Sequence, residues 1–405
     1  MTNAHLKIRF TRDEWRACLS LSMLYGLRML GLFLVFPILA AEAKHLDGGA
    51  DPLWIGIAVG IYGLTQAFFQ IPFGIASDRY GRRKTILVGL AVFALGSFVA
   101  AIATSIQWLA VGRALQGAGA ISAAVTAFLA DSTRDEVRTR AMALIGATIG
   151  LSFALSLIVA PVLSAAMGMD GLFWLTGLLV MAAMWPVVRM REPAHKKAPD
   201  YSFAQANRTV FSNGQLMRLN LGIFMIHMIQ TALFVVIPLA LIDMDMALAD
   251  HWKIYLPVVL CSFAAMIIPI FWAERSGQNK PAFLGAIALM GLAVLGFAWS
   301  PHVIWIWALV LFAFFTSFNV LEAFLPSWVS RVAPAEHRGL ALGIYNTTQS
   351  LGLFMGGLIG GSMTKAFGPE AVYWACAAAI LVWGIISAGL IELGPRKPTP
   401  SVVQS

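Results

Sequence analysis

The feature that most constrains this chain is a series of apolar runs. Each is roughly 18–27 residues long, which is enough to cross a bilayer as a helix. Only 12% of the residues are charged, against about 25% in soluble domains, and 59% are hydrophobic. The pattern predicts an all-α membrane protein whose twelve transmembrane helices lie near residues 16–41, 53–75, 86–104, 107–130, 140–166, 171–189, 219–242, 252–273, 281–300, 303–328, 339–364 and 371–391.

The basic residues predict how these helices are oriented. If the N-terminus is cytoplasmic, nearly all of the 28 Lys and Arg residues fall in cytoplasmic segments. The outer loops hold only Lys44, Lys253 and Lys365, while Arg28 and Arg113 fall inside spans. This asymmetry predicts that both termini are cytoplasmic. It also explains the net charge of +8 through contact with membrane lipid, so no nucleic-acid partner is needed.

A polar stretch divides the chain into two halves. We expect an N-terminal six-helix bundle over 1–189, a cytoplasmic linker over 190–218, a C-terminal six-helix bundle over 219–392 and a cytoplasmic tail over 393–405. "SDRYGRRK" at 77–84 and "AERSGQNK" at 273–280 share an acid, Arg, Gly and Lys at matching spacing. "EVRTRAMALIG" at 136–146 parallels "EHRGLALGIYN" at 336–346 at nearly the same offset. These matches predict an internal duplication and two pseudo-symmetric bundles.

Two motifs resemble signatures of the major facilitator superfamily. "GIASDRYGRRK" at 74–84 resembles the turn after helix two, and "RALQGAGA" at 113–120 resembles the helix-four signature. "GLRMLGLFLVFPIL" at 26–39, "GIYGLTQAFFQIPFG" at 60–74 and "LFWL" at 172–175 resemble the YajR subgroup of the drug:proton antiporter branch. The resemblance runs over about residues 15–390. It implies an antiporter of the bacterial inner (plasma) membrane that moves a small-molecule substrate and protons as a monomer.

Two departures from the subgroup stand out. Antiporters usually carry Gly-Pro in helix five, where this chain has Ala160-Pro161, and this leaves the direction of transport open. Subgroup members can also carry a soluble α/β domain after helix twelve. Because this chain stops at Ser405, we expect that domain to be absent.

The charged turn after helix two predicts a latch. Asp78 can accept from the N-terminal amides of another helix, and the resemblance places the helix that begins near Gly339 beside it. Either Arg82 or Arg83 can reach Asp131 at the end of helix four. The predicted latch shuts the cytoplasmic mouth in the outward-facing state and comprises Gly74, Asp78, Arg79, Gly81, Arg82, Arg83 and Asp131. The alternative is that these charges only orient the chain.

Ionisable side chains at membrane depth are costly, so each suggests a functional role. Arg28 lies roughly 18 Å into helix one, while His227 and Glu322 lie about 12 Å from the cytoplasmic side. A carboxyl group held away from water favours its protonated form, so we predict Glu322 as the main proton carrier, with His227 as its partner. Arg28 is a further predicted proton-coupling residue. The alternatives are an arginine that ties helices together through carbonyl groups, and a neutral Glu322 hydrogen-bonded to Asn319.

Polar stripes on several helices predict a shared substrate cavity. Its expected residues are Tyr62, Gln66, Gln70, Arg113, Gln116, Gln230, Asn319, Tyr345, Asn346 and Gln349. Gly352, Gly356 and Gly360 recur every fourth residue and instead predict close helix packing.

The combined pattern predicts a proton-coupled exporter of small, amphipathic organic compounds. No Gly-x-x-x-x-Gly-Lys-[Ser/Thr] sequence occurs, so we expect no nucleotide drive; metal-ligand spacing and a nucleophile–base pair are also missing, so we expect no cofactor and no enzyme activity. The first alternative is uptake or exchange of a small organic anion held by Arg28 and Arg113. The second is a membrane receptor or scaffold that transports nothing.

Overall fold

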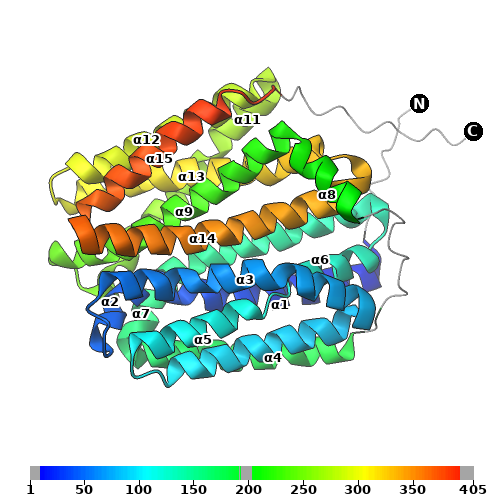
Figure 1. Ribbon diagram of the computed structural model, residues 1–405, viewed down its shortest axis with the longest axis horizontal. Coiled ribbons are helices and arrows are strands. Elements are labelled where there is room, and N and C mark those ends of the chain that lie inside the picture. Colours follow the sequence, from blue (N-terminus) through cyan, green and yellow to red (C-terminus); the bar gives the residue numbers. More distant parts are fainter. Residues whose placement is uncertain (1–9, 191, 193–202, 393–405) are drawn as a thin grey trace, which may run out of the picture. The chain divides into compact units, whose positions relative to one another are not determined.

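The computed structural model describes residues 10–190, 192 and 203–392 (Figure 1). The first part of the chain forms helices α1 (Arg12–Val35), α2 (Leu39–Glu42), η1 (Ala43–His45), α3 (Pro52–Tyr80), α4 (Arg82–Ala101), α5 (Ile106–Ala118), α6 (Ser122–Asp131) and α7 (Asp135–Arg189). The second part forms α8 (Phe203–Ser212), α9 (Gly214–Asp243), η2 (Leu248–Asp250), α10 (Trp252–Ala265), α11 (Ile267–Ser276), α12 (Asn279–Trp299), α13 (Ile304–Val332), η3 (Ala335–His337), α14 (Arg338–Phe367) and α15 (Glu370–Ser387). The described residues are thus all-α, as predicted.

Ten stretches of the described residues are helical, long and apolar enough to cross a membrane. Two differences separate this number from the predicted twelve. The first is the 55-residue α7, which covers two of the predicted spans but counts as one stretch, although Gly168 breaks its helical backbone at φ 71° and ψ 176°. The second is α14, whose glycines and polar side chains lower its mean hydropathy, so it does not appear among the ten. The twelve-span arrangement therefore stays a prediction.

Helix four is interrupted where the sequence led us to expect a continuous helix over 107–130. α5 ends at Ala118 and α6 begins at Ser122, with Gly119 at φ −73° and ψ 51° between them. The stretch "GAGA" therefore contains a helix break. Glycine has no Cβ atom and tolerates such a departure from helical backbone geometry. The break makes the carbonyl oxygen of Gly119 available to a side chain, which matters for the site below.

Several helices begin at sequence-encoded caps. The Thr11 hydroxyl accepts from the backbone N–H of Glu14 at 3.2 Å, and the Glu14 carboxylate accepts from the N–H of Thr11 at 2.8 Å, which together form a capping box. Asp51 accepts from the N–H of Leu53 at 3.0 Å, and Pro52 occupies the first turn of α3. Such caps satisfy backbone donors that a helix cannot satisfy internally.

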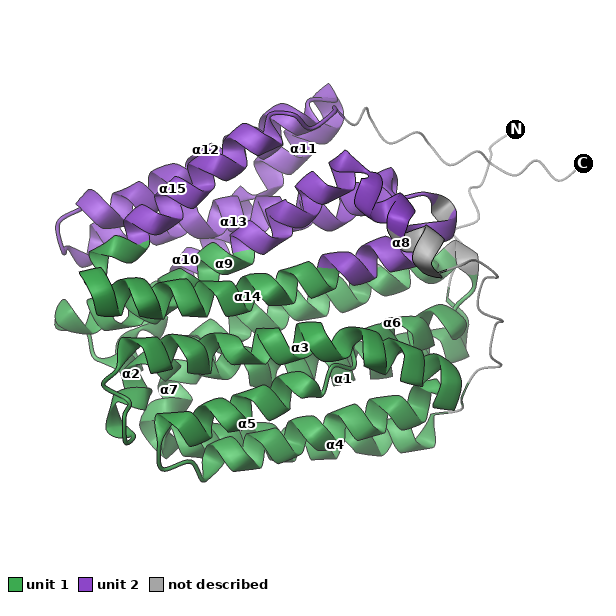
Figure 2. Ribbon diagram, viewed as in Figure 1, with its two compact units in different colours: residues 1–203, 227–256, 346–372 green, residues 204–226, 257–345, 373–405 purple. Residues whose placement is uncertain are grey.

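The chain divides into two compact units (Figure 2). Unit 1 comprises residues 1–203, 227–256 and 346–372, and unit 2 comprises residues 204–226, 257–345 and 373–405. Helices α8, α9, α10, α14 and α15 each contribute residues to both units. The predicted linker over 190–218 contains helix α8, and most of its remaining residues before Phe203 lie outside the described residues.

Each unit has its own core. Unit 1 buries Leu21, Leu90, Phe93 and Phe128 among helices α1, α4 and α6. In unit 2, the ring of Phe283 lies 5.0 Å from that of Trp328 and 6.2 Å from that of Trp383. Lipid tails are as apolar as these side chains, so dispersion contacts and small residues hold such helices together more than hydrophobic burial does.

The outer surface is strongly apolar. Phe68, Ile268, Leu292 and Trp305 are among many large hydrophobic side chains that are more than two-thirds exposed. A water-soluble protein would bury patches of this kind. Together with the long apolar helices, this surface shows a multi-pass membrane protein.

Candidate functional site

Arg28, Tyr62, Arg113 and Gln116 gather at membrane depth inside unit 1, and we call these four residues the arginine cluster. They come from α1, α3 and α5, and each is at most 1% exposed. The guanidinium carbon of Arg28 lies 5.8 Å from the centre of the Tyr62 ring, and that of Arg113 lies 5.3 Å from it. One aromatic ring therefore faces two cations, an arrangement that stabilises them only in part.

Backbone carbonyl groups and an amide orient the two guanidinium groups. Arg28 donates from Nη2 to the carbonyl oxygen of Gly119 at 3.2 Å, at the break between α5 and α6. Arg113 donates from Nη1 to Oε1 of Gln116 at 2.8 Å, one turn along the same helix. Gln116 in turn donates to the hydroxyl of Ser97 at 2.8 Å. The sequence predicted Arg113 and Gln116 on one face, and the structure brings them together.

Two further predicted cavity residues lie along α3. Gln66 is 8% exposed and Gln70 is 4% exposed, and the side-chain oxygen of each is buried with no hydrogen bond to any described residue. Tyr25 on α1 donates to the hydroxyl of Ser122 at 2.8 Å, and sequence reasoning missed both of these residues. Unit 1 therefore holds more buried polar groups than its own hydrogen bonds satisfy.

His227 pairs with a predicted cavity residue of another helix in unit 1. Nε2 of His227 on α9 lies 2.7 Å from the amide nitrogen of Gln349 on α14. His227 is 7% exposed, and Gln230, one turn further along α9, is 3% exposed. The carbonyl oxygen of Asn346 accepts from Ser350 along α14. The predicted polar stripes of α9 and α14 thus meet.

Glu322 lies in unit 2, on α13. Its Oε2 atom is buried without a hydrogen-bond partner among the described residues. In the same unit, the hydroxyl group of Tyr345 on α14 is also buried with no partner among the residues that the structure describes. Asn319 donates from its amide nitrogen to the hydroxyl of Ser262 of α10 at 3.0 Å, and the alternative in which Asn319 engages Glu322 stays a prediction. Since His227 belongs to unit 1, its pairing with Glu322 stays a prediction.

The charged turn between α3 and α4 forms a network inside unit 1. Arg82 donates from Nε to the carboxylate of Asp131 at 3.1 Å, from Nη1 to the hydroxyl of Ser77 at 3.1 Å, and to the carboxylate of Asp78. Gly81 adopts φ 101°, a backbone conformation that residues other than glycine rarely adopt. Of the two candidate arginines, the structure thus identifies Arg82, not Arg83, as the partner of Asp131.

The remaining latch residues have separate contacts. Arg83 donates from Nη1 to the carbonyl oxygens of Val188 and Met190, both at 3.3 Å. Arg79 places its guanidinium carbon 5.4 Å from the Tyr80 ring centre. α3 passes close to α6 at Gly74, where an added Cβ atom would lie 3.7 Å from that of Ala123. Asp78 is largely exposed, and its contact with the helix beginning near Gly339 stays a prediction, because that residue belongs to unit 2.

A double-mutant cycle should measure the Arg82–Asp131 pair. Both side chains are 12% exposed, so water screens the pair only partly. We expect Arg82→Gln and Asp131→Asn to show a coupling energy of about 1–2 kcal/mol in the free energy of unfolding. The matched cycle of Arg83→Gln with Asp131→Asn should be additive within about 0.5 kcal/mol. Equal coupling in both cycles would contradict the pairing.

The two halves repeat a capping arrangement that the sequence reasoning did not find. In unit 1, the backbone N–H of Arg83 at the start of α4 donates to Glu192 at 3.2 Å. In unit 2, the N–H groups of Asn279 and Lys280 at the start of α12 donate to Glu392 at 2.9 Å and 3.0 Å. Gly277, like its counterpart Gly81, has a positive φ, of 71°. These equivalent contacts support the duplication, since a carboxylate stabilises each helix N-terminus.

Glycines bring α3 and α14 together within unit 1. A Cβ atom on Gly56 would overlap the carbonyl oxygen of Gly357 and lie 2.9 Å from Cα of Gly361. Gly356 and Gly360, on another face of α14, approach the backbone of α9 in the same way. The predicted role of the α14 glycines in close helix packing is therefore confirmed for Gly356 and Gly360.

An ion pair joins the ends of the same two helices. Lys365 on α14 donates to the carboxylate of Asp51 at 2.6 Å, just before α3. This hydrogen bond holds the pKa of Asp51 below its ordinary value of 3.8. A carboxyl group with a lowered pKa in the folded state stabilises that state at neutral pH, and the contribution is lost as the pH falls through the folded-state pKa.

Asp51→Asn should therefore lower the unfolding midpoint at neutral pH but have progressively less effect in acid. Asparagine caps helices about as well as aspartate, so the substitution removes the charge and keeps the cap. The measurement is the unfolding midpoint of both proteins between neutral and acidic pH, with the exposed Asp47→Asn as the matched control. A difference that stays constant across this range would rule out the ion pair as its cause.

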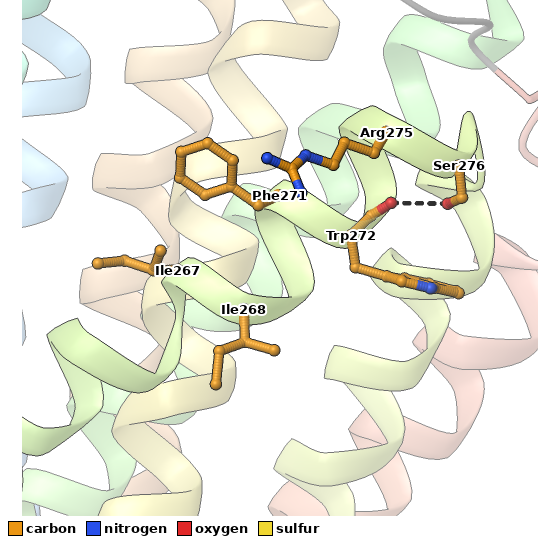
Figure 3. Close-up of a pocket in the computed structure, with 6 residues that line it drawn as sticks. All are labelled: Ile267, Ile268, Phe271, Trp272, Arg275 and Ser276. Carbon is orange, nitrogen blue, oxygen red and sulfur yellow. Dashed lines mark hydrogen bonds between the residues drawn. The ribbon is translucent and has the colours of Figure 1, made fainter.

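One surface hollow lies elsewhere, on α11 (Figure 3). It has a volume of about 630 Å³ and is lined by Ile267, Ile268, Phe271, Trp272, Arg275 and Ser276. Four of these side chains are large and apolar, and no residue of the predicted site contributes to it. We therefore assign the candidate site to the buried polar groups and read the hollow as part of the lipid-facing surface.

Comparisons with known proteins show the family to which the chain belongs. The Major Facilitator Superfamily model matches residues 21–320 and 271–405. The chain is 39% identical over 396 residues to the inner membrane transport protein YajR of Escherichia coli (strain K12), covering 95% of this chain and 85% of that protein. It is 28% identical over 289 residues to the chloramphenicol resistance protein CraA of Acinetobacter baumannii, covering 68% of each.

A solved structure agrees at the level of the fold. The D-xylose-proton symporter superposes with a TM-score of 0.75 at 13% identity, covering 94% of this chain and 98% of that one. This similarity extends over almost the whole length of both chains. The apolar helices, the signature motifs and these matches together show that the chain belongs to the Major Facilitator Superfamily of transporters.

Proposed function

We propose that this protein is a proton-coupled secondary transporter that exports small, amphipathic organic compounds across the bacterial inner membrane. The observation that carries the proposal is Glu322, a carboxyl group on a spanning helix with one oxygen buried and unpartnered. Such a group can bind a proton and release it as its surroundings change. Similarity to an inner membrane transport protein and to a chloramphenicol resistance protein supports the location and the direction.

The proposed cycle uses alternating access between two six-helix bundles. A proton entering from outside neutralises Glu322 and favours the inward-facing state. Loss of that proton to the cytoplasm resets the outward-facing state, in which Asp78 engages the helix that begins near Gly339 and closes the cytoplasmic mouth. The Arg82–Asp131 contact holds the turn that presents Asp78. In this cycle both chain termini are cytoplasmic, and the transporter works as a monomer.

Growth protection tests the export of toxic compounds. The full chain is expressed in a susceptible bacterial strain and challenged with a panel of amphipathic toxic compounds, with an empty vector for comparison. We expect growth at higher concentrations of at least one compound, and collapse of the proton gradient should abolish its export from loaded cells. Protection that persists without a gradient, or no protection across the panel, would oppose the proposal.

A second candidate is transport of a small organic anion, and the arginine cluster favours it. Two buried cations would suit the carboxylate of such a substrate. In this second candidate the two arginines bind the transported compound. Export driven by Glu322, in contrast, does not require the transported compound to be an anion. Uptake of radiolabelled organic anions into membrane vesicles, abolished by Arg28→Ala, would favour this second candidate.

A further inference from the structure

The arginine cluster contains two positive charges without a counter-charge. Arg28 is 0% exposed and Arg113 is 1% exposed. Neither forms an ion pair with an acidic side chain in the part of the chain that the structure describes. Because the guanidinium group stays protonated in proteins, both positions carry a charge. Burying an ion without a counter-charge is strongly unfavourable, and the two aromatic rings near Arg28 offset this cost only in part.

Several hydrogen-bond donors in the cluster have no acceptor. Arg28 donates from Nη2 to the carbonyl oxygen of Gly119, but its Nε and Nη1 are buried with no partner among residues 10–190, 192 and 203–392. The hydroxyl of Tyr62, whose ring both guanidinium groups approach, is also buried with no partner in the part of the chain that the structure describes. A planar guanidinium fork with free N–H groups matches the oxygens of a carboxylate, and it also binds single-atom anions.

The helix break beside Arg28 explains how the donors remain free. In a continuous helix, the carbonyl oxygen of Gly119 would accept from an N–H four residues later. Here it accepts from the N–H of Ile121 at 2.9 Å and from Arg28 at 3.2 Å. Nη2 is thereby held by a backbone carbonyl group, whereas Nε and Nη1 have no hydrogen-bond partner among the described residues.

We propose that the arginine cluster binds one small anionic group, with Arg28, Arg113 and the Tyr62 hydroxyl as its recognition elements. The anion is either a free inorganic ion such as chloride or the carboxylate of a transported compound. Both sources supply the negative charge and the acceptor that the cluster lacks. The site goes beyond the proposed export function, because it depends neither on the direction of transport nor on Glu322.

Chloride-35 NMR on the purified full-length protein tests this site directly. Chloride exchanging onto the protein broadens its resonance, and benzoate serves as the carboxylate competitor. We expect a saturable broadening in the unaltered protein, with the affinity for chloride reduced about tenfold or more in Arg28→Met. The matched control Arg189→Met removes an exposed arginine that stacks on Trp185, and it should bind as the unaltered protein does.

The competitor distinguishes the two sources of the anion. Displacement of chloride by benzoate would show that the cluster accepts both. Arg28-dependent chloride binding that benzoate does not displace would assign the site to inorganic anions. Benzoate binding detected by saturation-transfer NMR, dependent on Arg28 and without chloride binding, would assign it to carboxylates. Binding of neither probe, or binding that is equal in Arg28→Met, overturns the proposal.

Two milder variants keep the test decisive if Arg28→Met does not fold. Arg28→Lys retains the charge but loses the planar fork, and Tyr62→Phe removes only a hydroxyl group. Each should weaken anion binding several-fold, and unchanged binding in both would overturn the site. Glu322→Gln should leave anion binding intact, so a failure of proton coupling and a failure of the anion site would be seen separately.

Discussion

Glu322→Gln should abolish export against a concentration gradient while leaving exchange of the same compound across the membrane. Glutamine has nearly the same size as glutamate but cannot bind or release a proton near neutral pH. Because Oε2 of Glu322 is buried without a hydrogen bond, the substitution removes no ion pair and no hydrogen bond made by that oxygen. We expect proton-driven export to fall by about two orders of magnitude or more.

The measurement is the transport of a protective compound in proteoliposomes, with and without an imposed pH gradient. Glu336→Gln removes an exposed carboxylate from unit 2 and should transport as the unaltered protein does. Loss of both uphill export and exchange would indicate a folding or binding defect. Uphill export at the full rate in Glu322→Gln would show that another group carries the proton.

Gly56→Ala should destabilise the protein even though alanine is the better helix former. The added Cβ atom would overlap the carbonyl oxygen of Gly357, so α3 and α14 would have to move apart. Overpacking of this kind costs about 1–3 kcal/mol. The contact involves backbone on both helices, so a change of rotamer cannot relieve it. We expect a lower unfolding midpoint and slower transport.

Gly285→Ala provides a control with the opposite sign. Gly285 lies on α12 with an exposed face, and a Cβ atom there would meet nothing within 4 Å. Alanine is favoured over glycine in a helix by up to about 1 kcal/mol, so this variant should be unchanged or slightly more stable. Comparison of the two unfolding midpoints in detergent checks the prediction. A stable Gly56→Ala protein would mean that α3 and α14 do not need this close approach.

Sequence periodicity predicted the main features of the fold because they depend on local composition. Lipid leaves backbone groups no partner except within a helix, so long apolar runs predict spanning helices. The same local reasoning placed Arg113 and Gln116 on one face and predicted close packing at Gly356 and Gly360. It also predicted that Asp131 lies within reach of the charged turn. The structure was needed to identify Arg82, rather than Arg83, as the partner of Asp131.

The features that the sequence did not predict arise between distant segments. Glu192 and Glu392 cap helices that begin more than a hundred residues earlier, and no local pattern marks them. The break at Gly119 was missed because an apolar stretch with glycines also fits a continuous spanning helix. The free donors of Arg28 follow from that break, so they could be recognised only once the backbone path was known.

The most direct test of proton coupling is the proton movement that substrate itself drives. Purified protein is reconstituted into vesicles that contain a pH-sensitive dye, and a protective compound is added with no membrane potential and no initial pH difference. Substrate moving down its gradient should drive protons in the opposite direction, and Glu322→Gln should abolish that pH change. Substrate movement at an undiminished rate with no pH change in the unaltered protein would contradict proton-coupled export.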